Sequence, residues 1–165
     1  MESNLLEKVT LATGYCSALE NIYEYDKTTF INEMLRFLPR LYIAFSPDSE
    51  EETNSFDYGY YQTYVDEALY EEVRKKIESL MGEDDVFLET FEEDMKYSDT
   101  PIAASISESL ADIFQPLYNF ISVVRESDGE EITGAFFECR ENFESYWSQT
   151  LCNVLRALNN LKYKP

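Results

Sequence analysis

The sequence contains no histidine. Without an imidazole, the protein cannot use Ser-His-Asp or Cys-His catalysis, an imidazole-ligated zinc or iron site, or a histidine pH switch. Any catalysis would depend on carboxylates with a hard cation, on lysine or on tyrosine. The absence of histidine therefore excludes most enzyme classes and favours a non-enzymatic protein.

Glycine, proline and long apolar runs are also scarce. Five glycines and five prolines in 165 residues disfavour a turn-rich β sandwich or barrel. The apolar runs are short, so we expect no transmembrane helix and no membrane association. The opening residues, MESNLLEKVT, lack the basic region and cleavage site of a secretion signal, which predicts a cytoplasmic location. The length predicts one domain over residues 1–165.

The three cysteines, Cys16, Cys139 and Cys152, are odd in number and have no metal-ligand spacing. Cys139 and Cys152 are predicted to lie on one helix, about 20 Å apart at 1.5 Å per residue, which is too far for a disulfide. We interpret all three as small buried side chains in a reducing compartment.

Basic residues are few: 13 Lys and Arg stand against 33 Asp and Glu, for a net charge of −20. Such a chain repels the phosphate backbone and anionic lipids, so we expect no direct binding to nucleic acid. Cations and basic protein surfaces are the expected partners. Because the field is screened beyond about 8 Å at physiological salt, it would steer encounters more than it would set affinity.

Apolar residues recur three or four positions apart through most of the chain. This period predicts an all-α, single-domain, mostly antiparallel up-and-down bundle of about five long helices and one short helix. The long helices are expected over about 5–25, 29–45, 63–81, 101–124 and 130–161.

Capping residues mark several of the predicted boundaries. Asp26 precedes the second helix, and Thr63 with Asp66 resembles a capping box for the third, which Gly82 ends. Pro39 falls inside the second helix, where we expect a kink and no break.

The most acidic stretch is GEDDVFLETFEEDMKYSDTP, residues 82–101. Phe87, Phe91 and Met95 are spaced for one side of a short helix, so we predict an amphipathic helix here. Thr100 and Pro101 supply an N-cap and an N1 proline for the fourth long helix.

Residues 47–62 have no helical period and predict a long mobile loop. Its tyrosines could recognise a protein partner, or the loop could fold back to cover the bundle. The leading hypothesis is a non-enzymatic interaction protein that presents an acidic face to a basic or cationic partner. The candidate partner-binding residues are Glu89, Glu92, Glu93, Asp94, Asp99, Tyr58, Tyr60 and Tyr61. A nucleic-acid mimic is a further alternative.

A carboxylate metal site is the second hypothesis. The segment SESLADIFQPLYNFI resembles the helix that carries magnesium ligands in the all-α nucleotide pyrophosphatases, which would make the chain a magnesium-dependent hydrolase. The resemblance implies Glu89, Glu92, Glu108 and Asp112 as ligands, with Ser109 where that family has a glutamate. By helical geometry, Glu108 and Asp112 point away from the apolar seam of Ile113 and Leu117, as on a solvated face. No other cofactor is predicted.

One resemblance covers most of the chain. The segments GEDDVFLETFEEDMKYSDTPIAASISE and ESLADI are similar to the central segment of a family of uncharacterised small acidic helical proteins from Bacteroides-type bacteria. The resemblance implies a helical bundle and a bacterial cytoplasmic protein. It brings no catalytic residues, because that family is a domain of unknown function.

Overall fold

The computed structural model describes residues 3–47, 63–89, 102–127 and 129–164. Within them the chain is largely helical, with a pair of short strands. The elements are α1 (Ser3–Glu20), η1 (Ile22–Glu24), α2 (Lys27–Phe45), α3 (Glu67–Met81), η2 (Gly82–Asp85), β1 (Val86–Glu89), β2 (Ile102–Ser105), α4 (Ile106–Glu126), α5 (Gly129–Asn142), the π-helical turn η4 (Phe143–Trp147) and α6 (Ser148–Tyr163).

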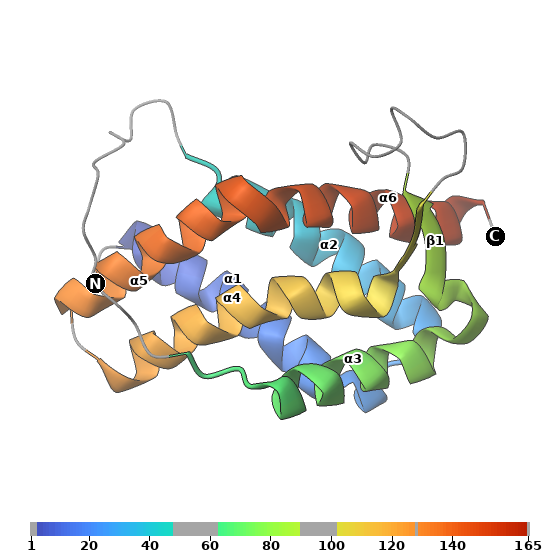
Figure 1. The fold of residues 1–165 in the computed structure, drawn as a ribbon. Coiled ribbons are helices and arrows are strands. Elements are labelled where there is room, and N and C mark those ends of the chain that lie inside the picture. Colours follow the sequence, from blue (N-terminus) through green and yellow to red (C-terminus); the bar gives the residue numbers. More distant parts are fainter. Residues whose placement is uncertain (1–2, 48–62, 90–101, 128, 165) are drawn as a thin grey trace.

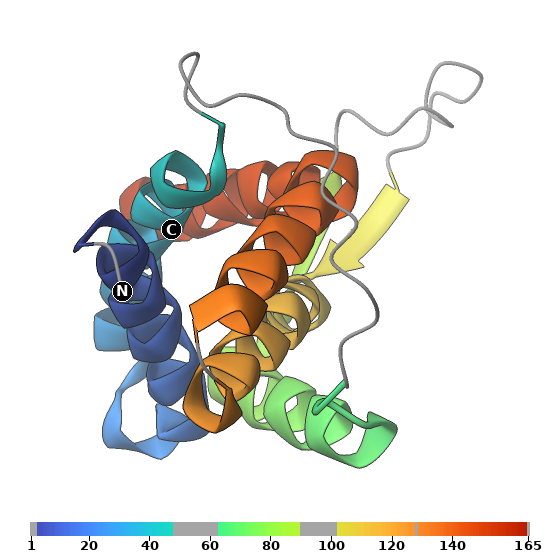
Figure 2. The ribbon, with the colours of Figure 1, turned by 90° about the vertical axis from the view of Figure 1, so that its left-hand side faces the viewer.

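The helices run up and down the molecule, as the apolar period predicts (Figure 1). α4 lies at the centre and packs against α1, α3, α5 and α6, while α2 packs against α1 and α6. α5, η4 and α6 follow one another as a single long rod. In the view turned by 90°, the strands lie beside the bundle and not within it (Figure 2). The predicted all-α bundle is confirmed.

Aromatic rings form the centre of the apolar core. Phe45 of α2 lies 5.3 Å from the Trp147 ring, 5.4 Å from Phe136 and 6.1 Å from Phe120, measured between ring centroids. The Phe143 and Trp147 rings meet edge to face, with their centroids 4.6 Å apart. These residues come from α2, α4, α5 and η4, so the aromatic cluster joins four elements of the bundle into one core.

Local signals in the sequence explain several helix ends. The Asp26 side chain accepts a hydrogen bond from the Thr29 amide at 2.8 Å, as expected of an N-cap. Gly82 ends α3 with a φ of 57°, a backbone angle that side chains disfavour. α2 continues through Pro39, as predicted.

The predicted short helix around Phe87 is wrong where the structure describes it. Residues Val86–Glu89 form β1, which pairs antiparallel with β2 from Val86↔Ser105 to Glu89↔Ile102. A contact between the residue before β1 and the first turn of α4 explains the strand pair. Asp85 is buried and accepts hydrogen bonds from Ser107, which holds the start of β1 beside the end of β2. Phe91 and Met95 lie outside the described residues.

Two predicted helix starts also need correction. α4 begins at Ile106 and not at Pro101, because Ser105 is the N-cap and accepts from the Glu108 amide at 3.1 Å. α3 begins after Asp66, whose side chain accepts from the Leu69 amide at 2.8 Å, so Thr63 caps nothing there. The predicted mobile loop lies outside the described residues apart from its first position.

Candidate functional site

Three acidic residues from two separate elements line one hollow of about 340 Å³. Glu89 comes from β1, and Glu108 and Asp112 come from one side of α4. We call this hollow the acidic groove. Its other lining residues are Ala104, Ser105, Ser109, Ser145, Tyr146, Gln149, Thr150 and Asn153. The lining is therefore almost wholly polar and contains no lysine or arginine among the described residues.

The hairpin positions one wall of the acidic groove. The buried Asp85 carboxylate accepts from the Ser107 amide at 2.8 Å and from the Ser107 hydroxyl at 2.6 Å, which joins η2 to the first turn of α4. Arg156 of α6 donates to the Leu88 carbonyl at 2.8 Å. Glu89 is thus held between two helices through its neighbours in the chain.

Asp112 is the most constrained carboxylate in the acidic groove. One of its oxygens accepts from the Tyr70 hydroxyl at 2.7 Å and the other from the Tyr146 hydroxyl at 3.0 Å. Burial, followed by the hydrogen bond to Asp112, raises the pKa of Tyr70 well above its usual value. Burial and the charge of Asp112 raise the pKa of Tyr146 in the same direction. Both phenols therefore remain protonated donors that fix Asp112 at neutral pH.

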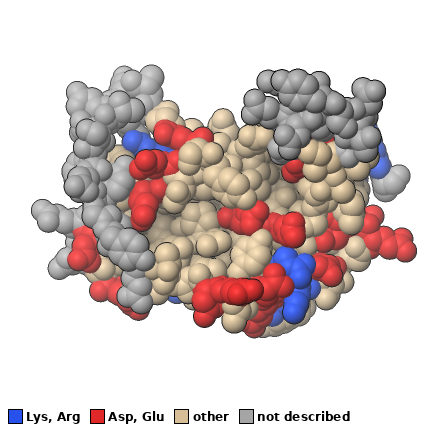
Figure 3. All heavy atoms as spheres, viewed as in Figure 1, with Lys and Arg blue, Asp and Glu red and all other residues tan. Residues whose placement is uncertain are grey.

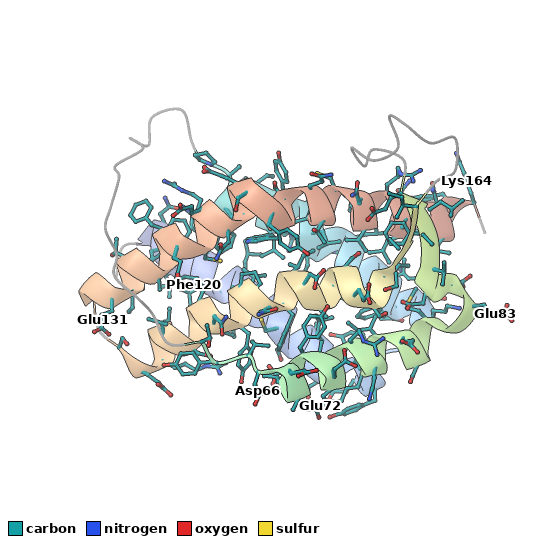
Figure 4. All side chains as sticks on the ribbon, in the orientation of Figure 1. Asp66, Glu72, Glu83, Phe120, Glu131 and Lys164 are labelled. Atoms are coloured by element: carbon teal, nitrogen blue, oxygen red, sulfur yellow. The ribbon has the colours of Figure 1, made fainter. Side chains whose placement is uncertain are left out.

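A second hollow, of about 400 Å³, meets the acidic groove at Asp112 and Tyr146. Irregular helical turns flank it on both sides. Pro116 in α4 has no amide hydrogen for the carbonyl of Asp112, and η4 on the facing rod is π-helical. The Trp147 indole donates to the Cys139 carbonyl at 3.2 Å, which satisfies a buried backbone acceptor beside the π turn. Phe120, labelled in Figure 4, lies on α4 on the side of this hollow.

Of the residues predicted for the metal hypothesis, the structure brings Glu89, Glu108 and Asp112 to one groove. Glu108 is exposed, as its helical position predicts. Within the described ranges, no group of three or more cysteine or acidic side chains has the geometry to hold a metal ion. The predicted partner-binding residues other than Glu89, among them the metal candidate Glu92, lie outside those ranges; they are Glu92, Glu93, Asp94, Asp99, Tyr58, Tyr60 and Tyr61.

Sequence reasoning did not identify the wall contributed by the last helical rod. Tyr146, Gln149, Thr150 and Asn153 follow one another at spacings of three, one and three, so they form one polar stripe on the rod. That spacing is visible in the sequence. The role of Tyr70 was not visible, because its partner Asp112 is 42 positions away.

Acidic side chains also spread beyond the groove. In the view of Figure 3 they occur over much of the visible described surface, and Lys and Arg occupy only a few places there. Asp66, Glu72, Glu83 and Glu131 project from the outer edge of the molecule in Figure 4, and all four are exposed. The groove is therefore a concave part of a larger acidic surface.

The cysteines offer no nucleophile to this site. Burial raises the pKa of the Cys16 and Cys139 thiols, so both remain protonated. Cys152 is exposed, which corrects the prediction that all three are buried. All three thiols are free in this structure. Arg140 is buried, with its guanidinium 4.8 Å from the Phe137 ring centroid.

Every helix in the described part of the chain is too short or too polar to cross a bilayer. Comparison with curated proteins found no match. The crystal structure of protein BF1032 from Bacteroides fragilis is similar to this chain, with 32% sequence identity and a TM-score of 0.81. The match covers 99% of this chain and 95% of the B. fragilis protein. A family model described as a domain of unknown function, DUF5063, matches residues 1–164. The resemblance to an uncharacterised helical family is confirmed, and the chain belongs to the DUF5063 family.

Proposed function

We propose that this protein is a non-enzymatic interaction protein whose acidic groove receives a lysine or arginine side chain from a basic partner protein. The main support is that Glu89, Glu108 and Asp112 line one hollow. Among the described residues, no lysine or arginine lines it. Residues 92, 93, 94 and 99 lie outside the described ranges and stay candidate partner contacts from the sequence alone.

The chemistry of the lining supports a cationic side chain. A guanidinium or ammonium group carries only donors, and the groove offers carboxylate, hydroxyl and amide oxygens as acceptors. Hydrogen bonds between charged partners contribute about 1.5 to 3 kcal/mol each, roughly twice the contribution of neutral ones. Asp112 is already oriented by Tyr70 and Tyr146, so less side-chain entropy is lost when it accepts a third donor.

The arrangement gives less support to the magnesium hydrolase. In the part of the chain that the structure describes, no group of three or more cysteine or acidic side chains has the geometry to hold a metal ion, and Glu108 lies on the exposed side of α4. We therefore do not propose a metal site, and no observation on the described residues favours the nucleic-acid mimic over a basic protein partner.

The test compares two charge-neutralising double variants for binding to a labelled arginine-rich peptide. The groove variant carries Glu89→Gln and Glu108→Gln. The control carries Glu24→Gln and Glu131→Gln, which are exposed and do not border the groove. Both variants have the same net charge, so a general electrostatic effect would weaken them equally.

We expect the groove variant to lose roughly tenfold in affinity, because tenfold corresponds to about 1.4 kcal/mol and each lost charged bond is of that size. The control should stay within about twofold of the unmodified protein at physiological salt, where distant charges are screened. Equal losses of affinity in the two variants would show that peptide binding depends on the net charge of the protein and not on the groove. That result would overturn the proposal.

A further inference from the structure

The charge of this protein is unevenly distributed along its helices. α2 and α6 together contain 35 residues, with five bases and only one acid, Glu33. They therefore carry a net charge of +4, while the whole chain carries −20. These two helices pack side by side, as Figures 1 and 2 both show. The arrangement gathers positive charge on one side of an otherwise acidic molecule.

A groove of about 780 Å³ follows the seam between α2 and α6. We call it the basic groove, and its polar lining residues are Asn32, Arg36, Arg156, Asn159, Lys162 and Tyr163. Arg36 follows Asn32 by four positions on α2, and Arg156, Asn159 and Lys162 follow one another by three on α6, so each helix turns one stripe toward the seam. No aspartate or glutamate of the described chain lines it.

One arginine of the basic groove is held in place by a hydrogen bond, and two of its basic residues form no ion pair within the described ranges. Arg156 donates one hydrogen bond to the Leu88 carbonyl at 2.8 Å, which fixes its guanidinium and leaves its other donors to point elsewhere. Neither Arg36 nor Lys162 forms a salt bridge with an acidic residue in the described ranges. Lys162 lies 5.2 Å from the Tyr163 ring centroid, which holds its ammonium group near the groove.

α6 thus separates two grooves of opposite character. Gln149, Thr150 and Asn153 line the acidic groove, and Arg156 and Asn159 line the basic groove. By helical geometry Thr150 and Asn153 lie on one side of α6 and Asn159 and Lys162 lie on another, while Arg156, seven positions after Gln149, lies at the border between the two sets. The basic groove is therefore a local exception to the charge of the molecule, and it needs an explanation of its own.

We propose that the basic groove binds a small polyanion, a molecule that bears phosphate or several carboxylate groups. Arginine forms paired hydrogen bonds to such groups, and the asparagine amides supply neutral donors. The volume lies within the range of small-molecule sites. A nucleic acid would extend past the groove onto the acidic surface and be repelled, so the charge distribution selects a small ligand. The proposal does not depend on the acidic groove.

The experiment is a calorimetric titration of the purified full chain with inorganic pyrophosphate, and in a second arm with citrate. The groove variant combines Arg36→Gln with Lys162→Gln. The matched control combines Arg40→Gln with Lys164→Gln: Arg40 lies one turn beyond Arg36 on α2 and lines a different hollow, and Lys164 does not line the basic groove. Arg36, Arg40, Lys162 and Lys164 are all exposed, and thermal unfolding verifies that both variants fold.

We expect the unmodified protein to bind pyrophosphate, the groove variant to lose roughly tenfold or more in affinity, and the control to stay within about twofold. Tighter binding of pyrophosphate than of citrate identifies phosphate chemistry, and the reverse identifies carboxylates; either result supports the proposal. Absence of binding to both probes at low ionic strength, or equal losses in the two double variants, overturns it. Peptide binding by the acidic groove should be unchanged in the Arg36→Gln, Lys162→Gln variant, which separates this test from that of the proposed function.

Discussion

The buried carboxylate of Asp85 accepts two hydrogen bonds from Ser107, at 2.8 Å from its amide and 2.6 Å from its hydroxyl. Ser107 lies in the first turn of α4, where the helix leaves backbone amides without intrahelical partners and favours a nearby negative charge. Asp85 therefore satisfies the end of the central helix from a different part of the chain. The same contact sets the position of β1 and, through it, of Glu89.

Replacement of Asp85 should destabilise the protein. We expect Asp85→Ala to reduce the free energy of unfolding by about 1 to 3 kcal/mol, because the Ser107 amide and hydroxyl would be left buried without this acceptor. Urea denaturation followed by circular dichroism measures the change. Asp84→Ala is the matched control, because Asp84 forms an exposed ion pair with Lys27 and should cost less than about 1 kcal/mol. Equal effects of the two substitutions would contradict the assigned role of Asp85.

The π-helical turn should depend on the indole nitrogen of Trp147. Trp147→Phe keeps an aromatic ring in the core but removes the hydrogen bond to the Cys139 carbonyl, so we expect a loss of about 1 to 3 kcal/mol in the free energy of unfolding. Trp147→Ala removes the ring as well and should cost about 3 to 5 kcal/mol. A Trp147→Phe variant within about 0.5 kcal/mol of the unmodified protein would show that the indole hydrogen bond is dispensable.

Stability should fall at alkaline pH through the tyrosines that contact Asp112. The folded state raises the pKa of Tyr70 and Tyr146, whereas an unfolded tyrosine titrates near pH 10. Below that pH the contribution of the neutral phenols is complete, and it is lost as the pH rises above about 10, because only the unfolded chain can release these protons readily.

The measurement is the urea midpoint of unfolding at pH 8 and at pH 10.5. We expect a smaller decrease between the two pH values in Tyr70→Phe than in the unmodified protein, because one phenol with a raised pKa is gone. Tyr163→Phe should behave like the unmodified protein, since Tyr163 is exposed. An unaltered pH dependence in Tyr70→Phe would contradict the contact with Asp112.

One thiol should be accessible in the folded protein. Cys152 is exposed, whereas Cys16 and Cys139 are buried. We expect a thiol reagent such as DTNB to label Cys152 in the native state and all three cysteines after denaturation. Cys152→Ser should abolish the native reaction. Rapid native labelling of Cys152→Ser would contradict the burial of the other two thiols.

The bundle was predictable because helix packing repeats locally. Apolar residues three or four apart identify a helix face without knowledge of its partner, and Asp26 and Gly82 mark ends through contacts within a few residues. β1 was not predictable in this way. Phe87 fits a helical spacing, and the strand forms through pairing with β2 and the anchor at Asp85, both of which involve residues far along the chain.

The site was predictable only in part, for the same reason. Glu108 and Asp112 lie on one side of α4 by local geometry, and Glu89 was already a candidate ligand and partner contact. Their convergence depends on the hairpin, and the tyrosines that orient Asp112 come from α3 and η4. No spacing in the sequence indicates such contacts between separate elements.

The most direct test of the proposed interaction function is an NMR titration of isotope-labelled protein with the arginine-rich peptide. We predict that the largest shifts of backbone amides fall on residues that line the acidic groove, including Ser109, Asp112 and Asn153, and that they weaken in the Glu89→Gln, Glu108→Gln variant. Shifts spread evenly over the exposed acidic residues of α3 and α5, with none concentrated at the groove, would contradict the proposal.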